Sequence, residues 1–167
     1  LGSRKADSAE TAILEANPFA RVFKRYETLT RENAEEIVGA ADVIVDGLDN
    51  FEARHALNEV SVRKRIPMIH AGVSGFRGQM TFLHPPETPC LWCLFPVAGL
   101  SETVPMVGCT PGVMGALQAA ECIKYLTGQG HVLSGRLLHW NGETMEFYVT
   151  DVERNPCCPV CSGTAAS

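Results

Sequence analysis

Residues 42–50 have the sequence DVIVDGLDN, which joins a strand to a helix through a short turn. The stretch Asp42–Asp46 is almost continuously apolar and β-branched, as in a parallel strand that is buried on both faces. Gly47 ends this strand, and Asp49 and Asn50 can begin a helix by capping its first turn. A strand, a turn and a helix in direct succession predict an α/β fold.

Helical and strand patterns alternate along the rest of the chain, without internal repeats or low-complexity tracts. This alternation favours a largely parallel sheet, and Asn141-Gly142 indicates a hairpin that adds an antiparallel C-terminal extension. With 167 residues, we expect one domain over residues 1–167. The predicted helices cover 6–16, 30–39, 50–65 and 112–126, and the predicted strands cover 20–26, 42–46, 68–73, 79–84, 137–140 and 145–149.

Composition and charge exclude several classes of protein. Apolar residues make up 46% of the chain and charged residues 20%, which is too apolar for a disordered chain. The formal net charge of −5, without a dense basic cluster, argues against nucleic acid as a partner. No apolar stretch matches a membrane span, and the first residues lack the apolar core of a signal peptide. We therefore expect a cytoplasmic protein with no membrane contact.

Two C-x-x-C pairs, Cys90/Cys93 and Cys158/Cys161, have the spacing of tetrahedral thiolate ligands. Four thiolates leave no open coordination position, so we predict one structural zinc ion that fastens the C-terminal end of the chain to its middle. Each C-x-x-C alone could also be a redox pair or a chance occurrence. A further alternative is that the cysteines are buried and free, but this would not explain their paired spacing. Cys157 lies outside this spacing and is interpreted as a bystander.

Two acidic residues, Asp46 and Asp49, follow the strand at 42–46. Ligands of open parallel sheets bind beyond the carboxyl ends of the strands, near the N-termini of helices. A carboxylate at this place can hold Mg²⁺, which in turn organises bound phosphates. The alternative is that Asp49 or Asn50 only caps the following helix.

An ordered set of motifs gives the chain a resemblance to a known family. The set comprises Gly2-Ser-Arg-Lys5, Asn17-Pro18, Asp46-Gly-Leu-Asp49-Asn50, Arg54, Asn58, Pro67, Gly78-Gln79, both cysteine pairs, Gly115-x-Leu-Gln118-Ala119 and Glu121. Together these motifs resemble the ThiF/MoeB/HesA family of ubiquitin-activating-like adenylyltransferases, and the resemblance spans nearly the whole chain.

The resemblance implies that ATP activates the C-terminal Gly-Gly carboxylate of a ubiquitin-like sulfur-carrier protein, which yields an acyl-adenylate and pyrophosphate. It also implies a homodimer. Lys5 is then expected to contact the nucleotide phosphates and Asp49 to bind the accompanying Mg²⁺, with Asn50 in the same nucleotide site. Both roles suit an attack on a phosphate, which cations stabilise. The alternative for Lys5 is a solvated lysine in a first helical turn.

The family's glycine-rich G-x-G-x-x-G nucleotide loop has no counterpart in this sequence. The glycines between Gly72 and Gly78 cannot replace it, because they lie between two predicted strands instead of leading from a strand into a helix. We therefore expect the C-terminal two-thirds of an adenylation domain, with an incomplete Rossmann-like sheet and incomplete activity.

Cys109 is a candidate sulfur-transfer thiol, because some members of the family use a cysteine in the segment after the first zinc pair. It precedes a predicted helix, whose positive end favours a thiolate nucleophile. The alternative is a tightly packed helix entry. Two rival functions also stay open, namely a non-catalytic zinc-stapled docking module for the same carrier and a nicotinamide-dependent dehydrogenase.

Overall fold

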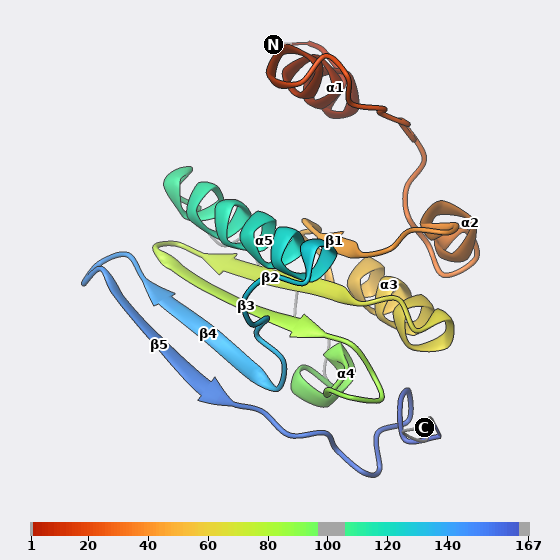
Figure 1. Cartoon of the computed structure of the whole chain (residues 1–167), viewed down its shortest axis with the longest axis vertical. Helices are drawn as coiled ribbons and strands as arrows, with labels where there is room; N and C mark the ends of the chain where they lie inside the picture. The colour runs from red at the N-terminus through yellow and green to blue at the C-terminus, as the bar shows by residue number, and fades with distance from the viewer. Residues whose placement is uncertain (1, 97–105, 164–167) are drawn as a thin grey trace.

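Five strands form one sheet in the computed structural model, which describes residues 2–96 and 106–163 (Figure 1). The strands are β1 (Ile44–Asp46), β2 (Met68–Ser74), β3 (Arg77–Leu83), β4 (Arg136–Asn141) and β5 (Glu146–Asp151), and they lie in this order across the sheet. The helices are α1 (Lys5–Ala16), α2 (Ala34–Val38), α3 (Phe51–Lys64), α4 (Leu91–Leu94) and α5 (Cys109–Thr127). The mixed α/β architecture is therefore as predicted.

Residues 97–105, which follow the first cysteine pair, and residues 164–167 lie outside the described part of the chain. None of the predicted helices and strands falls in these two ranges.

The sheet is parallel at one edge and antiparallel elsewhere. Strands β1 and β2 pair in parallel, since α3 crosses between them, and Asp46 lies opposite His70. The pairings β2–β3, β3–β4 and β4–β5 are all antiparallel. The prediction of a largely parallel sheet is therefore wrong for the described strands, of which only β1 and β2 pair in parallel. The physical reason is that β3 returns along β2 through a tight turn at Gly75-Phe76 and not through a crossover helix.

Residues 20–26 form no strand, so the strand predicted there is wrong. A strand needs a neighbour to complete its backbone hydrogen bonds, and none of the described strands pairs with this stretch. Phe19 and Phe23 are 92% and 90% exposed, so they pack against nothing in the described chain. Helix α1 forms as predicted, but none of its residues is buried, and it lies apart from the sheet (Figure 1).

Side chains of alternate strand residues form two apolar cores, one on each face of the sheet. Met68 and Leu83 pack with α3 and with Leu91 of α4 on one face. Ile69 and Phe82 pack with Met114 of α5 on the other face. Helices α3 and α5 therefore cover opposite faces of the sheet, and α3 begins shortly after the carboxyl end of β1.

Helix α5 approaches β3 closely at Gly78. A Cβ atom placed on Gly78 would lie 2.4 Å from Sδ of Met114, which is far inside van der Waals contact. Glycine is therefore required here by packing and not by a phosphate loop, in agreement with the sequence. None of the described helices is both long enough and apolar enough to span a membrane.

Candidate functional site

The carboxyl end of β1 carries a buried, fully hydrogen-bonded aspartate. Asp46 is 1% exposed, and its Oδ1 accepts a hydrogen bond of 2.9 Å from the backbone N–H of Leu48. Its Oδ2 lies 2.6 Å from Nδ1 of His70 and 3.3 Å from Nε of Arg54. Asp46 therefore holds the turn that leads into α3 and offers no oxygen to a ligand.

Two long side chains tie this turn to neighbouring elements. The Arg54 guanidinium donates to the carbonyl of Leu48 and, over 3.1 Å, to the carbonyl of Ala71 in β2. From the other face, Gln118 Nε2 of α5 donates to the carbonyl oxygens of Asp46 (2.8 Å) and Ile69 (3.1 Å). Since buried carbonyl groups must be satisfied, these contacts fix the loop between β1 and α3.

Asp49 and Asn50 have different roles in this turn. The side chain of Asn50 accepts a 2.8 Å hydrogen bond from the backbone N–H of Ala53 and thus caps α3. Asp49 is exposed, and its carboxylate contacts only the Asn50 amide, at 3.5 Å, in the described part of the chain. The capping alternative therefore applies to Asn50, while the carboxylate of Asp49 is available to a cation.

Lys5 is the first residue of α1 and is exposed. It lines a shallow hollow with Arg4, Arg25 and Tyr26. Because α1 lies apart from β1 and α3, the described structure does not bring Lys5 and Asp49 into one cleft (Figure 1). The predicted phosphate role of Lys5 stays a prediction.

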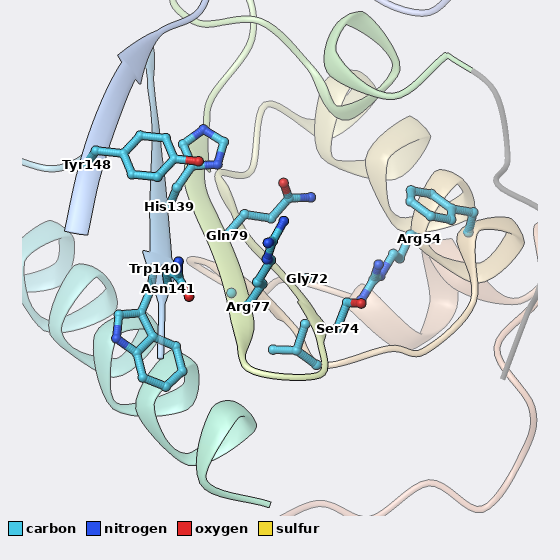
Figure 2. Close-up of a pocket in the computed structure, with 12 residues that line it drawn as sticks. Arg54, Gly72, Ser74, Arg77, Gln79, His139, Trp140, Asn141 and Tyr148 are labelled. Atoms are coloured by element: carbon cyan, nitrogen blue, oxygen red, sulfur yellow. The ribbon is translucent and has the colours of Figure 1, made fainter. Parts of the chain in front are cut away.

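A cavity of about 560 Å³ lies on the α3 face of the sheet (Figure 2). It lies beside the buried cluster that Asp46, Arg54 and His70 form. Figure 2 shows Arg77 and Gln79 of β3 between Arg54 and the β4–β5 hairpin. On that hairpin, the rings of His139 and Tyr148 are stacked, with centroids 4.5 Å apart. The remaining lining residues are Phe51, Gly72, Val73, Ser74, Gly78, Trp140 and Asn141. The Arg77 guanidinium and several hydrogen-bonding groups make this cavity suitable for an anionic, extended ligand, whereas the charge of Arg54 is paired with Asp46.

Sequence reasoning left Arg54, Arg77 and Gln79 unassigned and missed His70, His139 and Tyr148. Polar residues at alternate positions of 77–79 and 139–141 are the signal that marks one polar face of the strands. The pairing of His70 with Asp46 has no such signal, because it depends on the register of two parallel strands.

The four cysteines of the two C-x-x-C pairs converge, as predicted. Their sulfur atoms all lie within 4.8 Å of one another, and three pairs are 3.5, 3.7 and 3.9 Å apart. A tetrahedral zinc site with Zn–S distances of about 2.3 Å has sulfur atoms about 3.8 Å apart. Cys90, Cys158 and Cys161 are 0% exposed, and Cys157 is exposed and separate from the cluster. This geometry can hold one metal ion.

The pKa values of the cluster's thiols shift in both directions. At Cys158, hydrogen bonds from the backbone of Cys161 and Val160 outweigh burial and lower the pKa. Burial raises the pKa of the Cys90 thiol and of the Cys93 thiol, which disfavours their thiolates. A divalent cation within the cluster would have the opposite effect, because it stabilises thiolates directly. The donor set of four converging sulfur atoms therefore fits a zinc ion.

Burial also lowers the pKa of His70, although Asp46 opposes this effect. A neutral His70 can carry its proton on Nδ1, and this N–H then donates a hydrogen bond to the Asp46 carboxylate. Its Nε2 has no hydrogen-bond partner among the described residues.

Cys109 is the first residue of α5 and is exposed. It lies near the β2–β3 turn, because the adjacent Thr110 donates a 2.7 Å hydrogen bond to the carbonyl of Gly75. No described cavity contains Cys109 together with Asp49, and its sulfur-transfer role stays a prediction.

Comparison with curated proteins finds two informative relatives. The SAMP-activating enzyme E1 of Haloferax volcanii is 38% identical over 167 residues, which cover 96% of this chain and 62% of that protein. The sulfur carrier protein adenylyltransferase of Thermus thermophilus is 37% identical over 172 residues, which cover 96% of this chain and 64% of that protein. The chain thus spans less than two-thirds of the length of these relatives.

A solved structure with a similar fold and a family model also match this chain. The crystal structure of Escherichia coli MccB with ATP superposes with a TM-score of 0.80 at 20% identity, over 96% of this chain and 51% of that chain. This similarity concerns the fold. The model of the ThiF family matches residues 1–160, and the chain therefore belongs to the ThiF family.

Proposed function

We propose that the protein adenylylates the C-terminal glycine of a ubiquitin-like sulfur-carrier protein. The names of the two relatives describe the activation of SAMP and the adenylylation of a sulfur carrier. The observation that carries the proposal is that Asn50, and not Asp49, caps α3 after β1. The exposed carboxylate of Asp49 is therefore free to bind a cation.

The reaction requires the stabilisation of charge more than the transfer of protons. A carboxylate oxygen of the carrier forms a bond to the α-phosphorus of ATP, and the bond from this phosphorus to the bridging oxygen breaks. Pyrophosphate leaves with that electron pair, and the carrier becomes an acyl-adenylate. No general base is needed, since a C-terminal carboxyl group is ionised at neutral pH.

Asp49 is the residue we propose for the magnesium ion that accompanies ATP. Mg²⁺ takes oxygen ligands and is commonly bound by one or two carboxylates together with substrate phosphates. The exposed Asp49 carboxylate fits this requirement, whereas the two oxygens of Asp46 are already occupied. Lys5 is proposed as a phosphate contact on the strength of the family resemblance.

The cavity on the α3 face is proposed as the site of the carrier's C-terminal tail. Arg77 would attract its terminal carboxylate, and a Gly-Gly end, which carries no side chains, would fit beside Gly72. A Cβ atom on Gly72 would lie 3.4 Å from Gln79 Nε2, so the strand backbone itself borders the site.

Zinc at the four-cysteine cluster is proposed as a structural ion. It would connect the residues around α4 to the C-terminal segment, with no coordination position left for substrate. We also propose a homodimer. Val45 of β1 and Ile123 and Leu126 of α5 are 49%, 61% and 56% exposed, so apolar surface is available for a second copy.

The test is carrier-dependent exchange of radiolabelled pyrophosphate into ATP, measured with the complete encoded protein. We expect exchange with a carrier that ends in Gly-Gly, and loss of exchange when the final glycine is deleted or when Asp49→Ala is introduced. Binding of the carrier without any exchange would refute the proposal and favour the docking module. Binding of a nicotinamide cofactor would favour the dehydrogenase.

A further inference from the structure

The imidazole of His70 is in direct contact with Asp46, which lies three residues before the proposed magnesium ligand Asp49. Asp46 and His70 face each other across the parallel β1–β2 pair, with 2.6 Å between Nδ1 and Oδ2. Both side chains are 0% exposed, so His70 cannot touch a substrate in the described structure. The hydrogen bond through which the His70 side chain can act is the one to Asp46.

Asp46 transmits this contact to the following turn. Its second oxygen, Oδ1, accepts the 2.9 Å hydrogen bond from Leu48 N–H, so the two carboxylate oxygens connect His70 to the backbone one residue before Asp49. Rotation of the Asp46 side chain would break the hydrogen bond to Leu48. His70 opposes that rotation, because the same rotation would break its own hydrogen bond to Asp46. Breaking it would deprive two buried polar groups of this partner, which lowers the stability of the fold.

Packing alone does not account for a histidine at position 70. The sequence neighbours Ile69 and Ala71 pack in the apolar core on the opposite face of the sheet, whereas the His70 ring lies 5.6 Å from the ring of Phe95. An aliphatic side chain could pack against Phe95 without leaving Nε2 unpaired among the described residues. The polar contact that a histidine adds is the one to Asp46.

We propose that His70 is a positioning residue, which locks the Asp46 carboxylate and thereby fixes the turn that presents Asp49 to magnesium. This inference rests on the proposed function, since it concerns the same metal. Groups that hydrogen-bond directly to a metal ligand usually change metal affinity by about 10- to 100-fold when they are removed. Since His70 acts through Asp46 and the backbone, we expect an effect at the lower end of this range.

The test compares variants of the complete protein at position 70. His70→Leu removes the donor, and His70→Gln moves an amide donor to the position of Nε2, out of reach of Asp46. His70→Asn keeps an N–H donor near the position of Nδ1 and serves as the rescue variant. Thr81→Val is the matched control, because Thr81 is buried and lies opposite His70 on β3. This substitution also removes one hydrogen bond, which the Thr81 hydroxyl donates to the Arg136 carbonyl.

Two measurements are made on each variant. Hydrogen–deuterium exchange of residues 46–50 reports whether the turn is fixed, and it requires neither nucleotide nor activity. The Mg²⁺ concentration that gives half-maximal pyrophosphate exchange reports how well Asp49 is presented. We expect faster deuterium exchange and a Mg²⁺ requirement raised by about tenfold or more in His70→Leu and His70→Gln. His70→Asn and Thr81→Val should resemble the wild type in both.

The inference is overturned if His70→Leu and His70→Gln match the wild type in either measurement. It is also overturned if Thr81→Val raises the Mg²⁺ requirement equally, since the effect would then be general destabilisation. If one variant does not fold, the other decides. A wild-type protein without pyrophosphate exchange would refute the proposed function instead, and deuterium exchange would still decide whether His70 fixes the turn.

Discussion

Replacement of Arg54 by methionine tests the buried cluster after β1 most severely. Methionine has a similar length but no charge and no N–H donor. The side chain of Arg54 is 10% exposed and that of Asp46 is 0% exposed, and they form an ion pair of 3.3 Å. The substitution also removes the hydrogen bonds to the carbonyls of Leu48 and Ala71. Arg54→Met therefore leaves a buried carboxylate and two backbone carbonyls with fewer partners.

The expected loss follows from this burial. Removing one partner of a buried ion pair lowers the free energy of unfolding by about 3–5 kcal/mol. For a domain of this size, each kcal/mol lowers Tm by about 2–4 °C. The melting temperature of Arg54→Met should thus fall by roughly 6–20 °C.

A surface ion pair that involves the same helix provides the control. Arg31, in the turn before α2, lies 2.9 Å from Glu59 of α3, but the two side chains are 57% and 33% exposed. An exposed pair of this kind contributes about 0–1 kcal/mol, so Arg31→Met should lower Tm only slightly. Thermal unfolding followed by circular dichroism measures both variants. Equal, small shifts in Arg54→Met and Arg31→Met would refute the claim that the cluster holds the turn.

Three further results are expected. Cys158→Ser should abolish binding of one equivalent of zinc, measured by elemental analysis, and lower Tm; unchanged zinc content would contradict the four-sulfur site. Burial lowers the pKa of His55, so the unfolded state binds more protons and stability falls as pH drops below about 6.5. His55→Phe should weaken this fall in urea titrations between pH 7 and 5, by up to about 1.4 kcal/mol per pH unit, and an unchanged slope would contradict it. Gly78→Ala should cost about 1–3 kcal/mol in the same titrations, because its Cβ would overlap Met114, and a neutral effect would contradict this packing.

Local sequence signals predicted the first strand, the turn after it and the following helix well. The apolar run before Asp46 and the cap at Asn50 act within a few residues of one another, so β1 and α3 form where they were predicted. The spacing of the cysteine pairs likewise predicted their convergence, since each pair forms one short turn. Residues 20–26 show the limit of such signals, because a strand also needs a partner that the local sequence does not reveal.

The parts of the site that could not be predicted depend on contacts between distant elements. His70 meets Asp46 only because β1 and β2 pair in parallel with a particular register. The cavity also depends on contacts between distant elements, since Arg54 comes from α3, Gln79 from β3 and Tyr148 from β5. No local pattern in the sequence specifies which of these side chains will face one another.

The central claim is that Asp49, at the end of β1, serves the activation of a carrier's terminal carboxylate. The most direct measurement is the intact mass of a Gly-Gly-terminated carrier after incubation with ATP, Mg²⁺ and the complete protein, in the wild type and in Asp49→Asn. We predict a carrier species heavier by one adenylyl group with the wild type and none with Asp49→Asn. Equal amounts of adenylylated carrier with both proteins would contradict the account.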